Sequence, residues 1–116
     1  MKFPIYNHKI KTSGQYKFVY SSKNKIYHNN FAVYYRLNNQ NKPFFGISIS
    51  CKVGNSVVRH KIKRWFFESL KIYGYDFSPH YNYVFVVKNI DNIKNFIIFC
   101  EAIESILKSI NKYINK

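Results

Sequence analysis

Acidic residues are scarce in this chain, and they are missing altogether from its first 67 positions. Only five of the 116 residues are Asp or Glu, against nineteen Lys and Arg, which gives a net charge of +14. All five acids lie at or beyond position 68, whereas thirteen of the bases precede it. A mixed-sign surface would be enough for solubility, so a field of one sign in one half indicates a polyanionic partner. Nucleic acid is the favoured partner, and an anionic membrane surface is the weaker candidate.

The groups that catalysis requires are also lacking in the basic half. With no carboxylate before Glu68, that half offers neither a carboxylate base nor the oxygen ligands that Mg²⁺ prefers. The four histidines are scattered along the chain, and Ser48 and Ser50 have no His–Asp set near them in the sequence. We therefore expect no catalytic residue and no metal held tightly by the protein itself.

Long apolar runs, linkers and repeats are absent as well. The apolar segments are too short to span a bilayer, and the N-terminus lacks the hydrophobic stretch and cleavage site of a secretory signal. The two cysteines, Cys51 and Cys100, lack metal-ligand spacing and fall in apolar patterns, which favours buried, reduced thiols over a disulfide. These features predict a cytoplasmic protein with a single domain over residues 1–116, in which residues 1–12 form a flexible basic arm.

Hydrophobic periodicity predicts elements in the order α-β-β-β-α-β-α, a small α+β sandwich of one sheet with about four strands and three helices. Ser13 is placed to cap the first helix, and Gly74 to end the second. The expected elements are helices over 14–22, from 55 or 56 to 73, and from 91 onward, strands over 31–37, 44–51 and 83–87, and a brief extended stretch over 25–28. The last helix should carry a stripe along one side, broadened by further apolar residues, that runs through Ile93, Ile97, Cys100, Glu104, Leu107 and Ile114.

Two segments, FAVYYRL and FFGISISC, alternate apolar residues with small or polar ones. A polar turn separates them, so we expect them to pair as a hairpin with both apolar sides in the core. The opposite face would then be a shallow trough floored by Gly46, Ser48 and Ser50, with Tyr34 and Arg36 beside it. Small side chains on that floor would leave room for a ligand.

The helix expected over 55–73 carries cations on one side and an apolar arc, which includes Ile62 and Trp65, on the other. A charge run is usually only a solvated face, but here like charges recur at i, i+4 with no acid before Glu68. Such repulsion costs stability unless a polyanion binds, and the helix N-terminus adds N–H groups that suit a phosphate. The candidate RNA-binding residues are Lys52, Gly54, Asn55, Arg59, His60, Lys61, Lys63 and Arg64.

Three tyrosines are candidates for stacking on bases. Tyr16 and Tyr20 share one helix face and Tyr34 lies on the first long strand, so each fits either a core position or a stacking position. Tyr34 is the strongest of the three, because it shares a strand face with Arg36 while Val33 and Tyr35 face the core. Aromatic rings beside a basic groove are how single-stranded RNA is commonly held.

The stretch ISISCKVGNSVVRHKIKRWFFESL resembles the signature of the bacterial ribonuclease P protein component, a Gly-x-Ser-x-Ser strand leading into a basic helix. The matching residues are Lys52, Gly54, Val57, Arg59, Lys63, Arg64 and Glu68. This chain departs from the family pattern at Ser56, His60, Lys61 and Phe67. The early aromatic helix, the strands and the last helix also occur in the expected order, so the resemblance covers nearly the whole chain.

This resemblance implies a subunit of a ribonucleoprotein in which the catalytic RNA removes the 5′ leader of precursor tRNA with the help of Mg²⁺. The protein would bind the RNA through its basic helix and hold the single-stranded leader in a cleft with Tyr16, Tyr20 and Tyr34 and a floor that includes Ser48 and Ser50. The resemblance also implies a ribosomal-protein-like fold in which a left-handed crossover joins two parallel strands.

Two other interpretations of the charge and aromatic pattern remain open. A non-enzymatic ribosomal or RNA-chaperone protein would use the same basic surface and stacking trough. A DNA-binding protein with residues 57–70 as a recognition helix is less favoured, because strands rather than a partner helix flank that segment.

Overall fold

The computed structural model describes residues 2–114 and contains one four-stranded mixed sheet with three α-helices. This confirms the α+β class and the predicted order of elements. In chain order the elements are η1 (Ile5–His8), α1 (Ser13–Tyr20), β1 (Lys25–Tyr27), β2 (Phe31–Leu37), β3 (Phe44–Ile49), α2 (Ser56–Tyr73), η2 (Gly74–Asp76), β4 (Tyr81–Val87) and α3 (Phe96–Ile114). Among these described residues, no helix is long and apolar enough to cross a membrane.

The strands lie in the order β1-β2-β4-β3, so the predicted hairpin between β2 and β3 is wrong. Both of these strands pair with β4 instead, β2 antiparallel and β3 parallel. The reason lies in β4, whose continuous apolar run needs cover on both faces and therefore occupies the centre of the sheet. Parallel strands need a long crossover, and α2 supplies the one between β3 and β4.

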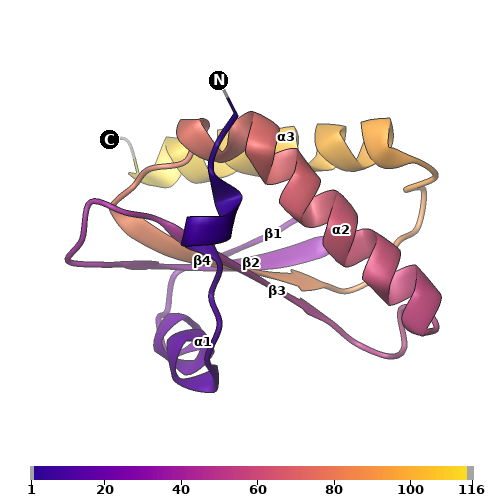
Figure 1. Ribbon diagram of the computed structural model, residues 1–116, viewed down its shortest axis with the longest axis horizontal. Helices are drawn as coiled ribbons and strands as arrows, with labels where there is room; N and C mark the ends of the chain where they lie inside the picture. Colours follow the sequence, from indigo (N-terminus) through magenta and orange to yellow (C-terminus); the bar gives the residue numbers. More distant parts are fainter. Residues whose placement is uncertain (1, 115–116) are drawn as a thin grey trace.

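The helices cover the two faces of the sheet unequally: α2 and α3 pack on one face, and α1 lies on the other (Figure 1). The main core lies between the sheet and the helix pair, with Phe66 from α2, Phe85 from β4 and Phe99 from α3 all fully buried. A smaller cluster of Ile10, Val19 and Val84 holds α1 against the opposite face. Because α1 is only eight residues long, it leaves part of that face uncovered.

The N-terminal segment is part of the fold, so the prediction of a flexible arm over residues 1–12 is wrong for residues 2–12; Met1 lies outside the described residues. Phe3, Ile5 and Ile10 are buried. The segment is also tied down by backbone hydrogen bonds, since Phe3 N donates to Lys71 O at 2.9 Å and Ile10 N to Phe45 O at 2.9 Å. Burial of these three apolar side chains outweighs the charge of the lysines in the segment.

Helix ends agree with the sequence for α2 and differ for the other two helices. The α2 helix is capped by Asn55 and ends at Gly74, as expected. The α1 helix begins at Ser13, but its cap is Thr12, which forms a capping box with Gln15. The α3 helix begins only at Phe96, after Asn95 Oδ1 accepts a hydrogen bond from Ile98 N at 2.9 Å.

Both the buried face of α3 and one of the cysteines also differ from the prediction. The α3 residues that contact the core are Phe99, Ala102, Ile103, Ile106, Leu107 and Ile110, whereas Ile97 of the predicted stripe is 70% exposed. Several apolar stripes were compatible with this helix, and packing against the sheet selects among them. Both cysteines are free; Cys100 is half-buried, and burial raises the pKa of its thiol, but Cys51 is exposed, contrary to prediction.

Candidate nucleic-acid interface

Hydrogen bonds within the turn that precedes α2 stabilise the N-terminal end of this helix. Asn55 Oδ1 accepts a hydrogen bond from Val58 N at 3.0 Å, and Ser50 Oγ accepts one from Lys52 N at 3.1 Å. The side chain of Arg59 returns to the turn, where its Nε donates to Gly54 O at 3.2 Å. Arg59 is therefore half-buried and partly structural, and Ser50 lies in the turn beyond β3, where it does not contribute to the floor predicted for it.

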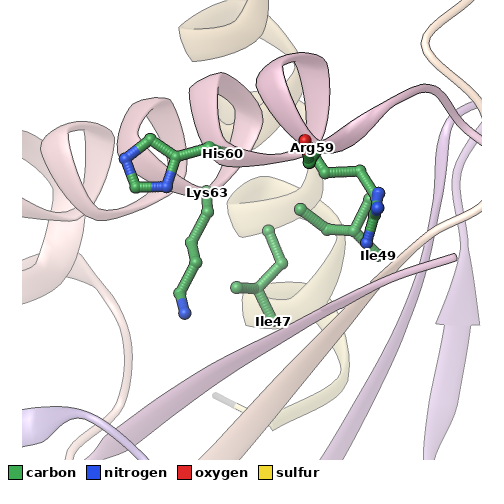
Figure 2. A pocket seen from close by; sticks show the side chains of 6 residues that line it. Ile47, Ile49, Arg59, His60 and Lys63 are labelled. Atoms are coloured by element: carbon green, nitrogen blue, oxygen red, sulfur yellow. The ribbon is translucent and has the colours of Figure 1, made fainter. Parts of the chain in front are cut away.

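Three of the predicted basic residues, Arg59, His60 and Lys63, meet at one hollow between α2 and the edge strand β3. The hollow has a volume of about 300 Å³, and its other lining residues are Ile47, Ile49 and Ser56. Figure 2 shows Lys63 extending from α2 toward the strand, and Arg59 lying beside Ile49. An apolar floor below two permanent cations offers an environment in which a phosphate would be strongly attracted.

The other predicted cations, on α2 and in the turn before it, lie outside this hollow. Lys61 places its Nζ 5.0 Å from the centre of the Trp65 ring, and Arg64 and Lys52 are exposed to solvent. The first acid of the helix, Glu68, is engaged by Lys71 at 2.6 Å, and this hydrogen bond is the main cause that lowers the pKa of the Glu68 carboxyl. The basic N-terminal half of α2 thus meets no competing carboxylate along its own length.

On the opposite face of the sheet, the three predicted tyrosines form one wall. Tyr16 and Tyr20 stack at 6.3 Å between ring centres, and Tyr20 meets Tyr34 edge-on at 5.1 Å. Tyr16 is anchored to the edge strand, because its OH donates to Ile47 O at 3.3 Å. Partial burial raises the pKa of Tyr20, whose phenol also bonds to the Ser48 side chain. The α1 helix thus presents its aromatic side to a hollow of about 480 Å³ lined also by Ser13, Lys17, Ile47 and Ser48.

This hollow with its wall of tyrosines is the trough that the sequence predicts, but its floor differs from the predicted one. Ser48 is exposed there as expected, but Gly46 is buried below the Tyr16 ring. Because β4 separates β2 from β3, the residues beside Ser48 are Val86 and then Ala32. Arg36 shares the Tyr34 face but is taken up by the end of α1: its Nη1 donates to Phe18 O at 2.8 Å and to Ser21 Oγ at 2.6 Å. Arg36 therefore stabilises α1 and does not present its charge to the trough.

Gly46→Ala is expected to damage this wall, because a Cβ at position 46 would lie 2.8 Å from the ring of Tyr16. The ring would have to move and lose its bond to Ile47 O, at a cost of roughly 1–3 kcal/mol in the free energy of unfolding. Denaturant titration measures the loss. The matched control is Gly14→Ala, whose nearest atom would be 3.9 Å away and which should leave stability equal or improved. Equal stability of the two variants would contradict the close packing of Tyr16.

The acidic residues are confined to one part of the fold. All four strands and α1 contain no Asp or Glu, and the five acids lie in α2, η2, α3 and the segment between β4 and α3. The aromatic trough is therefore built wholly from elements without negative charge. The hollow beside α2 and the trough lie on opposite sides of the same edge strand, and Ile47 lines both.

Sequence comparison places this chain among named relatives over most of its length. Residues 6–111 match the family model described as Ribonuclease P. The ribonuclease P protein component of Carboxydothermus hydrogenoformans is 33% identical over 103 residues, which covers 87% of this chain and 89% of the relative. The protein of the same name from Clostridium botulinum is 35% identical over 107 residues, covering 90% and 96%.

The fold is also similar to solved structures. A Staphylococcus aureus RNase P protein mutant, described as having defective mRNA degradation activity, superposes with a TM-score of 0.82 at 23% identity, over 91% of this chain and 90% of that one. The RNase P protein from Thermotoga maritima gives a TM-score of 0.78 at 18% identity, over 88% and 96%. At these identities the likeness establishes a shared fold.

Proposed function

The chain belongs to the ribonuclease P protein family, and from this membership we propose how its two surfaces divide the binding of RNA. It is an accessory subunit of ribonuclease P, an RNA-binding protein of tRNA processing, in an enzyme whose chemistry is carried by RNA. The proposed partners are the catalytic RNA of ribonuclease P and precursor tRNA. One observation carries the division: a basic hollow and an aromatic trough lie on opposite sides of β3.

The basic side of α2 binds the folded catalytic RNA. Folded RNA presents mainly phosphates, and contacts to phosphates need cations and backbone N–H groups but no base-stacking surface. The region from Lys52 to Arg64 offers such cations, with Arg59 and Lys63 converging on one hollow. His60 lines the same hollow and can donate a hydrogen bond to a phosphate oxygen.

The trough on the other face binds the single-stranded 5′ leader of precursor tRNA. A single strand exposes its bases, which can stack on aromatic rings while cations attract the backbone. The wall of Tyr16, Tyr20 and Tyr34 supplies the rings, and Lys17 supplies a cation at its rim. The small side chain of Ser48 on the floor leaves room for a base beside the rings.

Mg²⁺ belongs to the RNA side of this division. The described residues contain no group of three or more His, Cys, Asp or Glu side chains placed to hold a metal ion, and the two RNA-facing surfaces lack carboxylates. Mg²⁺ supplies charge stabilisation for phosphodiester hydrolysis when bound. This chain's residues instead position the leader and neutralise phosphates. The proposed localisation of the protein is cytoplasmic.

Reconstitution tests this function directly. The protein is mixed with the catalytic RNA of the same enzyme and with precursor tRNA at limiting Mg²⁺, and correct 5′ cleavage is measured with and without the protein. Stimulation should be larger for a precursor with a leader long enough to cross the trough than for one with a single leader nucleotide. No stimulation over RNA alone would remove the proposal and favour a ribosomal or RNA-chaperone role. Cleavage by the protein without RNA would reveal a catalytic site in the chain.

Lys63→Gln should weaken binding of the catalytic RNA and flatten its salt dependence by about one phosphate contact. Lys63 is the cleaner probe of the hollow, because Arg59 also holds the turn at Gly54. The measurement is the slope of log K against log salt concentration. Lys108→Gln is the matched control, since Lys108 is an exposed helical lysine on α3 with only a 3.8 Å ion pair to Glu104. Equal slopes for Lys63→Gln and the unmodified protein would exclude Lys63 from the interface.

A further inference from the structure

The row of residues that floors the trough continues beyond it to the far edge of the sheet. Register places Ala32 beside Val86 on one side and beside Tyr27 on the other. One row therefore crosses all four strands in the order Ser48, Val86, Ala32 and Tyr27. Neighbouring strands are about 4.8 Å apart, so the backbones at the two ends of this row are roughly 14 Å apart.

Tyr27 ends the row with an open aromatic ring. It is 67% exposed, although it belongs to a strand whose central residue, Ile26, packs against the core. Ala32, its neighbour in the row, has a side chain too small to cover the ring. The α1 helix lies over the next rows, where Val19 packs with Val84, and so does not close off this end.

Two cations lie near the Tyr27 ring. Lys25 Nζ lies 5.6 Å from the centre of Tyr27 and the same distance from Tyr34, so this side chain bridges the wall of the trough and the end of the row. Lys88, which follows β4, brings its Nζ to 5.4 Å from the Tyr27 ring. A hydrogen bond with Tyr27 is the main cause that raises the pKa of the Lys25 ammonium. An exposed ring with two ammonium groups near it suits a base attached to phosphates.

We propose that Tyr27, with Lys25 and Lys88, is a second base-stacking position that extends the path of single-stranded RNA across the whole sheet to its β1 edge. This proposal rests on the proposed function. The RNA segment that would reach Tyr27 is the upstream part of the 5′ leader, whose downstream part is bound by Tyr16, Tyr20 and Tyr34. A nucleic acid fits this surface better than a protein segment does, since all four strands and α1 lack acids and two cations lie near the exposed ring. Tyr27 then sets the leader length up to which added nucleotides increase the affinity.

The test uses the holoenzyme and precursor tRNAs whose leaders are lengthened one nucleotide at a time. The Kd should fall with length until the leader spans the row, and Tyr27→Ala should remove only the last part of that gain. Loss of one stacked base predicts about a 5-fold or greater rise in Kd for long leaders, with no change for short ones. Tyr27→Phe keeps the ring but loses the hydrogen bond to Lys25, so it should retain most of the affinity for long leaders. Tyr6→Ala is the matched control, because Tyr6 is also an exposed tyrosine with a lysine near its ring, yet lies on η1, outside the row.

The outcomes separate this inference from the function on which it rests. A length-dependent loss in Tyr27→Ala, absent in Tyr6→Ala, supports the second position. Unchanged affinity at every length, while Tyr34→Ala still weakens binding, overturns the inference and leaves the trough as the leader site. An equal loss at all lengths also overturns it, because Tyr27 would then act on the fold or on another part of the RNA. Absence of any length dependence in the unmodified protein contradicts the proposed function itself.

Discussion

Tyr34→Ala is expected to raise the Kd of the holoenzyme for leader-bearing precursor tRNA by about 5- to 150-fold, the loss of roughly 1–3 kcal/mol of base stacking. The half-buried ring of Tyr34 is fixed edge-on against Tyr20 at 5.1 Å and lies under Lys25 Nζ at 5.6 Å. A ring held in place loses little freedom when a base stacks on it, so most of the stacking free energy contributes to affinity. Equilibrium binding to precursors with long leaders measures the effect.

Two comparisons make the Tyr34 result specific. Tyr34→Phe keeps the ring and should retain most of the affinity, since the edge-on contact with Tyr20 that positions the ring does not need the hydroxyl. Mature tRNA, which lacks the leader, should bind equally well to the Tyr34→Ala and unmodified holoenzymes. If Tyr34→Ala folds normally and leader affinity stays the same, the Tyr16–Tyr20–Tyr34 wall has only a structural role.

Phe85→Ala is expected to lower the free energy of unfolding by about 3–5 kcal/mol, the usual cost of removing a fully buried ring. Phe85 lies at the centre of β4 and is 0% exposed. Its ring is 4.9 Å from that of Phe66 on α2 and 6.4 Å from that of Phe31 on β2, so the cavity would lie where the basic helix meets the sheet. Denaturant unfolding with an unchanged m-value measures the loss, and thermal unfolding should shift downward by roughly 10 °C or more.

The control for Phe85 is graded in size. Phe85→Leu fills most of the space and should cost markedly less than Phe85→Ala. At temperatures where both variants remain folded, the salt dependence of RNA binding should be that of the unmodified protein, because Phe85 reaches neither RNA-binding surface. A loss of less than about 1 kcal/mol for Phe85→Ala would contradict the central position of β4 in the core.

Local patterns predicted the single elements well. The bounds of α2 follow from Asn55 at its start and Gly74 at its end, and the bounds of β2 follow from strict alternation. The cluster of cations on α2 was also predictable, because side chains three and four apart share one side of any helix. These features depend on residues close together in the chain.

Errors arose where distant segments compete for the same place. Local alternation favours a β2–β3 hairpin, but such a hairpin leaves the apolar β4 with no central position, whereas pairing both strands with β4 buries its apolar residues. The N-terminal segment was interpreted as an arm because its lysines dominate the sequence, yet Phe3 fits over Gly74, where a Cβ would come within 2.3 Å of its ring. Arg36 was assigned to the trough from its strand face, but the carbonyl end of α1 binds it.

The amino-acid sequence by itself determined the chemistry of this protein: a basic half without carboxylates, a cationic side of α2, and tyrosines on α1 and β2. These are properties of composition and of local spacing, which hold in any arrangement of the elements. Only the tertiary structure decided where that chemistry lies. Central placement of β4 puts Val86 between Ser48 and Ala32, aligns Tyr27 with them, and sets the basic hollow and the aromatic trough on opposite sides of β3. Strand order is selected by burial on both faces of the sheet at once, and no local pattern encodes that balance.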